Sequence, residues 1–308
     1  MSAAGSAAAP ARAREFATQV LVRPWKRMLV HRGKATLTYL TQPEAHTFAF
    51  SVAANAILSF FPFMFLMMWI IRNVFHSQAM FDVVGQLLNS YLPTDQQFVI
   101  RNLTSMVLGH ARVQIASIII LVVSSSGVFL PLEVAFNQIW GFSRNRSYIG
   151  NQAISFVLAF GSGVLALASV ALAGGAETVV AFLLRSNENI VFRAVAFLIL
   201  KVFGIIASVA IFFLIYWLLP NGKVSARSVL PAAVAMGILW DVAKYIYILA
   251  LPWLNFKDVY GPFSISVTLV FWAFVSGLMV LAGAYLAADP GEGQGSDQRQ
   301  EGPRFEPA

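Results

Sequence analysis

The sequence contains no cysteine and few charged residues. The absence of cysteine excludes disulfides, thiolate nucleophiles and cysteine-based metal sites. Aspartate, glutamate, lysine and arginine together make up 11% of the 308 residues, whereas soluble domains usually contain about 25%. A chain with so little charge is not expected to be a soluble globular protein.

Motifs for catalysis, metal binding and cofactor binding are also missing. The four histidines show no spacing typical of metal ligands: they are His31, His46, His76 and His110. No phosphate-binding loop, dinucleotide fingerprint or nucleophile elbow occurs. We therefore expect no metal, no cofactor and no enzymatic activity, because an intramembrane enzyme would also need one of these devices or a nucleophile.

Long apolar runs dominate what is present. Hydrophobic residues make up 58% of the chain, and they cluster in six runs of about 20 residues or more, the length that crosses a bilayer. These runs are too long and too continuous for barrel strands. They predict an all-α membrane protein, a six-helix transmembrane bundle, with helices at Phe48–Ile71, Ile115–Ile139, Ala153–Ala173, Ala194–Leu219, Val229–Leu254 and Pro262–Ala288.

The distribution of basic residues predicts the orientation of these helices. Counted by loop, thirteen Lys and Arg residues lie on the side of the two termini, and six lie on the opposite side. The positive-inside rule therefore places both termini in the cytoplasm. The net charge of +7 follows from this topology and from attraction to anionic lipid, so we expect no nucleic-acid partner.

Three segments outside the spans complete the predicted organisation. Residues 1–47 form a basic cytoplasmic segment with an interfacial helix, and residues 289–308 form a flexible cytoplasmic tail. The transmembrane domain covers residues 48–288 and includes an external loop at 72–114. That loop contains FDVVGQLLNSYLP and FVIRNLTSMVLGH, which have the spacing of two amphipathic helices separated by Pro93.

Two opposite charges lie in the middle of the fifth predicted span. Asp241 and Lys244 are three residues apart, so they share one helix face with Gly237 and Tyr245. A charged side chain exposed to lipid costs roughly 3 kcal/mol or more. The pair is therefore expected to face protein or water. It is either a neutralised pair that fixes helix packing or part of a polar cavity.

Other polar side chains recur at helical spacing inside the spans. Glu133 and Asn137 share a face of the second predicted helix, and Asn55 lies between Ser51 and Ser59 in the first. Lys201, in the fourth, either neighbours Asp241 or extends toward the membrane surface. Such stripes either bond helices together or converge on a wet interior. The candidate cavity-lining residues are Asp241, Lys244, Glu133, Asn55, Asn137 and Lys201.

Several blocks of the sequence resemble one family. They are FSVAANAILSFFPFMF, LEVAFNQIWGFSRNRS, LLPNGKVSARSVLPAAVAMGILWDVAKYIYILALPW and VYGPFSISVTLVFWAFVSGLMVLAGAYLAA. The chain resembles the YihY/BrkB family of bacterial inner-membrane proteins from about Ala45 to Ala288. The residues at positions of the family pattern are Ser59, Pro62, Asn137, Trp140, Pro220, Lys223, Val224, Gly237, Trp240, Lys244, Tyr260, Gly261, Trp272 and Gly283. Tyr285 departs from it, because the family commonly has glutamate there.

The resemblance implies a six-helix protein of the bacterial plasma (inner) membrane, for which transport or lipid translocation is a common suggestion. A ribonuclease label attached to such proteins does not fit a chain without an aqueous site. We predict a transporter or lipid translocator with a polar intramembrane cavity, with membrane lipids as partners and an anionic or lipid-like substrate. The alternative is a non-catalytic membrane scaffold or envelope-assembly partner, in which the buried ion pair is structural.

Overall fold

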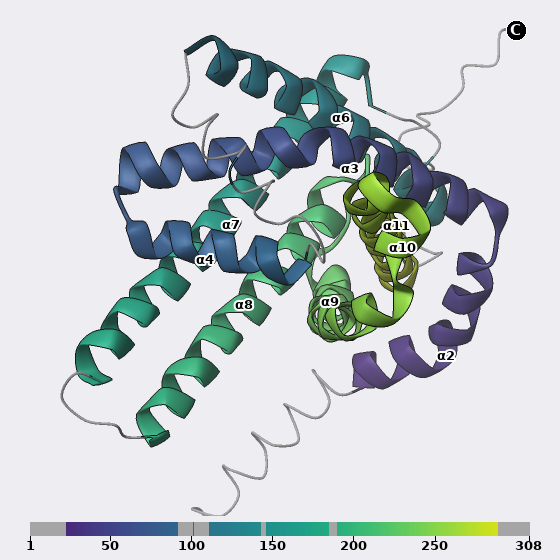
Figure 1. The fold of residues 1–308 in the computed structure, drawn as a ribbon. Helices are drawn as coiled ribbons and strands as arrows, with labels where there is room; N and C mark the ends of the chain where they lie inside the picture. Colours follow the sequence, from purple (N-terminus) through teal and green to yellow (C-terminus); the bar gives the residue numbers. More distant parts are fainter. Residues whose placement is uncertain (1–22, 92–100, 102–110, 143–145, 185–189, 289–308) are drawn as a thin grey trace, which may run out of the picture.

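The computed structural model describes residues 23–91, 101, 111–142, 146–184 and 190–288, and within these ranges the chain is helical, without strands. Figure 1 shows how the helices are arranged. Their bounds are α2 Arg23–Leu40, α3 Pro43–Ile70, a π-helical turn at Ile71–Phe75, α4 Gln78–Tyr91, α6 Ala111–Trp140, α7 Tyr148–Leu184, α8 Ile190–Leu218, α9 Ala226–Leu254, α10 Phe256–Tyr260, a 3-10 turn at Gly261–Phe263 and α11 Ser264–Ala287.

Each of the six predicted runs corresponds to a helix. In the described part of the chain, five stretches are long and apolar enough to cross a membrane: Pro43–Phe75, Ile149–Leu172, Lys201–Leu218, Ala226–Leu254 and Phe256–Ala287. The remaining prediction corresponds to α6, which is a helix but is not among these five. The structure thus confirms an all-α chain with several membrane-length helices.

The surface of these helices is apolar. In the most apolar part of each span, at most 33% of the residues are buried inside the protein. Large apolar side chains such as Phe160, Leu249 and Trp253 are instead exposed. A soluble protein rarely exposes so much apolar surface, so the exterior of this fold is suited to lipid.

Small residues allow the central helices to approach closely. A Cβ atom added at Gly277 of α11 would lie 3.1 Å from the Cα atom of Ala49 in α3, and one added at Gly237 of α9 would lie 2.9 Å from the Cα atom of Val209 in α8. These contacts are with backbone atoms, which cannot move away by a change of rotamer as a side chain can. Close approach at such points is typical of helix pairs in membranes, where packing replaces the hydrophobic effect.

The predicted amphipathic helix after the first span is confirmed as α4. Its apolar residues Met80, Val83, Val84 and Leu88 are buried, at the three- and four-residue spacing of one helix face. They belong to a cluster that also contains residues of α3 and α7. α4 therefore covers one end of these helices. The second predicted amphipathic stretch and Pro93 lie outside the described residues.

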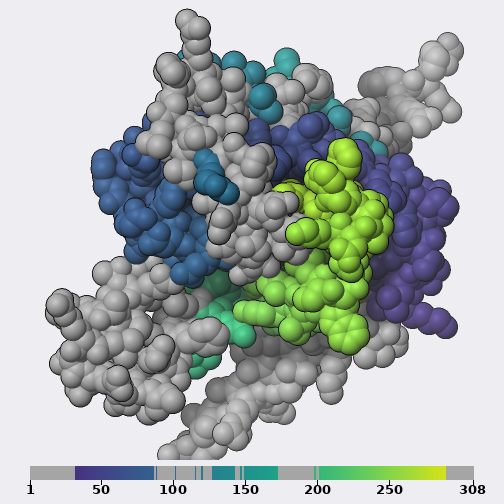
Figure 2. Space-filling model, in the orientation of Figure 1, coloured from purple at the N-terminus to yellow at the C-terminus, as the bar shows by residue number. Residues whose placement is uncertain are grey.

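The N-terminal helix α2 lies against the end of α11. In the space-filling view, α2 (purple) and α4 (blue) occupy opposite edges of the molecule (Figure 2). The guanidinium of Arg32 donates a hydrogen bond of 3.2 Å to the carbonyl of Leu286. α2 thus joins the end of the fold at which α3 begins and α11 ends, far from α4.

Candidate functional site

Asp241 and Lys244 form an ion pair within α9. Lys244 Nζ donates to Asp241 Oδ1 at 2.5 Å. The Asp241 residue is 8% exposed, and its second carboxylate oxygen is buried with no hydrogen-bond partner among the described residues. The pair is neutral as a unit, which is how charges are tolerated at membrane depth. The predicted contact between the two side chains is confirmed.

A tyrosine links this pair to Lys201 of α8. The ammonium of Lys201 lies 4.7 Å from the centre of the Tyr245 ring, and that of Lys244 lies 5.6 Å from the same centre. Both distances suit cation–π attraction. Two cations from two helices are therefore gathered around one ring, beside the Asp241 carboxylate. Lys201 thus contacts the Tyr245 ring, next to the pair in α9, and its two predicted placements, beside Asp241 or toward the membrane surface, stay predictions.

Glu133 and Asn137 lie in a second group, at the end of α6. Glu133 is 1% exposed, and its Oε1 accepts a hydrogen bond of 3.0 Å from the backbone N–H of Arg146. Asn137 Oδ1 accepts one of 2.7 Å from the backbone N–H of Asn221. These bonds fasten the end of α6 to the connection between α6 and α7 and to the connection between α8 and α9.

The Arg146 side chain completes this second group. Its guanidinium donates to the carbonyls of Leu218, Leu219 and Pro220, at 3.1, 2.7 and 2.8 Å respectively. These carbonyls end α8, where no helical N–H remains to bind them and where the helix dipole is negative. Burial lowers the pKa of the guanidinium, and the Glu133 carboxylate opposes this shift. Arginine remains charged throughout the physiological range.

Asn55 takes part in helix packing. Its side-chain Nδ2 donates to the backbone carbonyl of Ser51 at 2.9 Å, and the backbone carbonyl of Asn55 accepts from the hydroxyl of Ser59 at 2.9 Å. A Cβ atom at Gly127 of α6 would collide with the Asn55 side chain. The polar stripe of α3 therefore bonds to its own helix and fills the space that Gly127 leaves.

The six candidate residues thus fall into separate groups. Asp241 and Lys244 pair within α9, and Lys201 of α8 contacts the neighbouring Tyr245 ring. Glu133 and Asn137 bond at the end of α6, and Asn55 packs between α3 and α6. None of the six lines either of the two cavities described below. Their convergence on one polar cavity stays a prediction.

The first of these cavities, the apolar cavity, has a volume of about 260 Å³. It lies between α3, α4, α9 and α11. Trp240 and Trp272 contact each other there, with ring centres 5.2 Å apart, and Tyr247 lies 4.6 Å from Trp272. The full lining is Phe60, Met64, Met67, Val84, Leu88, Trp240, Tyr247, Leu269 and Trp272. Its lining is mainly apolar, and the Tyr247 hydroxyl already donates to the carbonyl of Thr268, so the cavity is suited to an apolar group.

Sequence reasoning missed the roles of some of these residues. Trp240 and Trp272 were notable only for their match to a family pattern, and Arg146 only as a charge that fixes orientation. Glu133 lies near the end of a predicted span and thirteen residues before Arg146. This was a weak signal for the contacts at the end of α6. The cavity gave no signal, because its lining comes from four helices that are distant in sequence.

The structure also explains three glycines of the family pattern. Gly261 has φ +52°, a conformation that side chains disfavour. Gly237 packs on the Val209 backbone, and a Cβ at Gly283 would collide with the Tyr216 hydroxyl and with Met236. Each position excludes a larger residue for a local steric reason.

Comparison with known proteins agrees with this fold. The model of the family described as Virulence factor BrkB matches residues 36–305, so the chain belongs to this family. It is 24% identical over 294 residues to a UPF0761 membrane protein of Chromohalobacter salexigens, covering 91% of this chain and 68% of the relative. It is 25% identical over 241 residues to one of Pseudoalteromonas atlantica, covering 76% and 77% respectively. No solved structure matches significantly.

Proposed function

We propose that this membrane protein is a transporter or lipid translocator of the bacterial inner membrane, and not an enzyme, and that the apolar cavity receives part of an acyl chain. The observation that carries the proposal is this cavity, a partly open space between four helices that is lined by apolar and aromatic side chains. Its volume of about 260 Å³ is below the roughly 300–1,000 Å³ typical of sites for whole ligands. It suits a segment of a chain.

The apolar cavity alone would not attract a lipid. A methylene gains about 0.8 kcal/mol on leaving water, but almost nothing on leaving the bilayer, which is equally apolar. The cavity instead keeps a chain in apolar surroundings while its headgroup moves. Selectivity must then come from polar groups beside the cavity.

Lys244 lies in a suitable place for such a headgroup. It follows Trp240 by four residues and precedes Tyr247 by three, so all three lie on one stripe of α9. Its ammonium is held by Asp241 in this structure, and both it and the ammonium of Lys201 lie near the ring of Tyr245, which is not part of the cavity lining. An anionic headgroup that displaced the Asp241 carboxylate would gain a cation next to the cavity.

The proposed topology has six spans, which are the five apolar stretches given above and α6, and it places both termini in the cytoplasm. Two observations support it. α6 has 30 residues, enough to cross the hydrocarbon core. The bonds from Arg146 and Asn137 bring the end of α6, the start of α7 and the end of α8 together, as alternating spans require.

A scaffold role is the second candidate function. The contacts of Glu133 and Asn137 at the end of α6 favour this role for these two residues. Glu133 and Asn137 bond to backbone of the same chain, and Asp241 is neutralised by Lys244. In that role, these groups fix helix register and handle no substrate.

Lipid movement in proteoliposomes distinguishes the two. The assay measures how fast fluorescent phosphatidylglycerol and phosphatidylcholine become accessible to a membrane-impermeant quencher. Leu269→Trp, which fills the apolar cavity, should slow movement at least several-fold, and Lys244→Ala should slow the anionic lipid more than the neutral one. Leu249→Trp is the matched control, because Leu249 is 73% exposed. Movement no faster than in protein-free liposomes, or unchanged in both Leu269→Trp and Lys244→Ala, would reject transport and favour the scaffold.

A further inference from the structure

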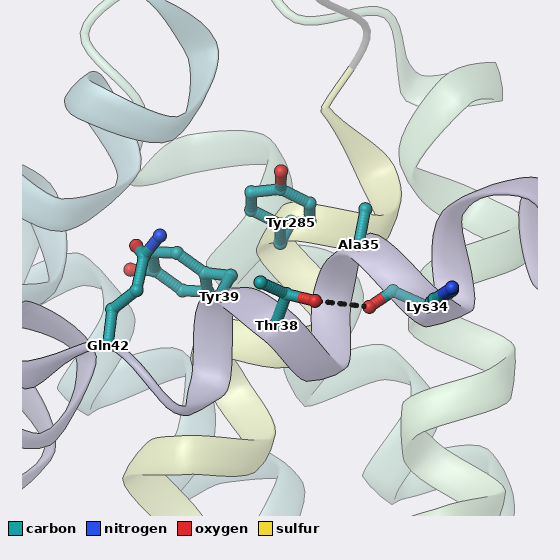
Figure 3. A pocket seen from close by; sticks show the side chains of 6 residues that line it. All are labelled: Lys34, Ala35, Thr38, Tyr39, Gln42 and Tyr285. Atoms are coloured by element: carbon teal, nitrogen blue, oxygen red, sulfur yellow. Dashed lines mark hydrogen bonds between the residues drawn. The ribbon is translucent and has the colours of Figure 1, made fainter.

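A second cavity, the polar pocket, lies between α2 and the end of α11. Its volume is about 450 Å³, and it is lined by Lys34, Ala35, Thr38, Tyr39, Gln42 and Tyr285. Figure 3 shows these side chains along α2 with Tyr285 facing them from α11. The transport proposal does not use this pocket, and its Tyr285 is the residue that departs from the family pattern. α2 lies at the other edge of the molecule from α4 (Figure 2).

Two contacts build the pocket. The rings of Tyr39 and Tyr285 are stacked, with centres 4.9 Å apart and planes 15° apart. One residue further along α11, the carbonyl of Leu286 accepts the hydrogen bond from Arg32. Since Lys34 and Thr38 are four residues apart, they rise on one side of α2. The stacked rings of Tyr39 and Tyr285 therefore form one side of the pocket, and Lys34 is its basic residue.

The groups in the pocket are mostly hydrogen-bond donors. Lys34 supplies an ammonium, Gln42 an amide, and Tyr39 and Tyr285 a hydroxyl each. The Thr38 hydroxyl already donates to the carbonyl of Lys34, at 3.1 Å. A cation and several neutral donors around one space are suited to a phosphate, which offers acceptor oxygens and negative charge.

One neighbouring group opposes anion binding. Burial, and after it the charge of Glu44 and the neighbouring Tyr285, raise the pKa of the Tyr39 hydroxyl to about 12. Glu44 lies in the first turn of α3. The same carboxylate repels an anion, so the pocket is suited to weak, exchangeable binding. The Tyr39 hydroxyl is protonated at neutral pH with or without this shift, and it is therefore able to donate.

The surroundings distinguish a lipid from free phosphate. Leu37, between Lys34 and Thr38 in sequence, is 66% exposed. α2 also contains Arg23, Lys26, Arg27, Arg32 and Lys34, and basic helices with exposed apolar residues lie in the interface of anionic membranes. Free phosphate would make no contact with the Leu37 side chain, whereas the glycerol and acyl chains of a phospholipid would pack against it.

We propose that the polar pocket binds the phosphate headgroup of an anionic phospholipid, with Leu37 against its apolar part. The site is independent of the apolar cavity, and its failure would leave the transport proposal unaffected.

The test is lipid binding by the full-length protein, measured by native mass spectrometry in detergent with phosphatidylglycerol or phosphatidylcholine. Phosphatidylglycerol should bind the unmodified protein more tightly. Lys34→Gln should weaken its binding about fivefold, because one basic residue near an anionic surface contributes roughly that much. Lys223→Gln removes the same charge from an exposed site outside the pocket and should leave binding unchanged.

Tyr285→Phe provides a second variant that keeps the stacked ring and removes only a donor, so it should weaken phosphatidylglycerol binding while preserving the melting temperature. Equal binding of the two lipids by the unmodified protein, or equal effects of Lys34→Gln and Lys223→Gln, would overturn the proposal. Displacement of the lipid by millimolar inorganic phosphate would overturn the assignment to lipid.

Discussion

Two arginines cap helix ends in this protein. Arg146 binds the last carbonyls of α8, and Arg32 binds the carbonyl of Leu286 in the last turn of α11. Both helix ends offer unbound carbonyls and a partial negative charge. In the sequence, these arginines counted only toward orientation. The structure gives them a second use, because each guanidinium also satisfies carbonyls at a helix end.

Replacement of Arg146 should therefore destabilise the protein. Arg146→Ala removes a guanidinium that binds three carbonyls, and hydrogen bonds to charged groups contribute about 1.5–3 kcal/mol each. We expect the melting temperature in detergent to fall by roughly 5 °C or more. Arg146→Lys should be intermediate, because an ammonium lacks the planar fork.

The control for this prediction is Arg227→Ala. Arg227 is exposed in the first turn of α9, so its loss removes the same charge from the same side of the protein. An equal fall in melting temperature for the two variants would show that net charge matters and capping does not.

Glycine positions offer a sharper comparison. A Cβ at Gly237 would lie 2.9 Å from the Val209 backbone, whereas one at Gly204 of α8 would have nothing within 4 Å. Gly237→Ala should force α8 and α9 apart and cost about 1–3 kcal/mol. Gly204→Ala should be neutral or stabilising by up to about 1 kcal/mol, because alanine favours helix. Thermal unfolding of the two variants in parallel measures the difference, and similar melting temperatures would contradict the proposed packing.

Among the helices, α2 is held to the rest by few contacts, and one of them depends on pH. The pKa of Tyr39 is raised to about 12, chiefly by burial. In the undocked helix it would ionise near its ordinary pKa of 10. The docked state thus binds more protons between pH 10 and 12, so docking is fully stabilised below pH 10 and weakens as pH rises through this range.

Unfolding of the wild-type and Tyr39→Phe proteins tests this dependence. From pH 10 to pH 12, the melting temperature of the wild type should fall more steeply than that of Tyr39→Phe, which has no proton to lose at this position. Any effect of pH on the rest of the protein is common to both proteins and cancels in the comparison. Parallel curves would mean that Tyr39 ionises freely in the folded protein.

Helices were predictable from the sequence because their signal is local. The apolar runs gave the positions of α3 and α9, and the apolar spacing in FDVVGQLLNSYLP predicted the amphipathic helix α4. Contacts between helices were not predictable, since they depend on which faces meet. The charges at Asp241 and Lys244 could be paired because they lie on one turn. The stack of Tyr39 on Tyr285 could not, because 246 positions of chain separate the two residues.

For the chain as a whole, the arrangement of helix ends makes the membrane topology testable. The connections after α2, α6 and α8 lie at one end, joined by the bonds of Arg32, Arg146 and Asn137. The six-span proposal puts this end in the cytoplasm and puts the turn after α3 and the short helix α10 outside. The absence of cysteine means that any introduced thiol is the only one.

Single cysteines at exposed positions should therefore react from opposite sides with a membrane-impermeant thiol reagent. Thr41→Cys and Ser225→Cys should be protected in intact cells and react in inverted vesicles, because they lie at the proposed cytoplasmic end. His76→Cys and Lys257→Cys should show the reverse. All four positions are exposed in the structure, so a silent cysteine reports the membrane barrier and not burial. Reaction of Ser225→Cys from the outside would exclude the proposed orientation. Reaction of Thr41→Cys and His76→Cys from the same side would show that α3 does not cross the membrane, and the six-span topology would then fail.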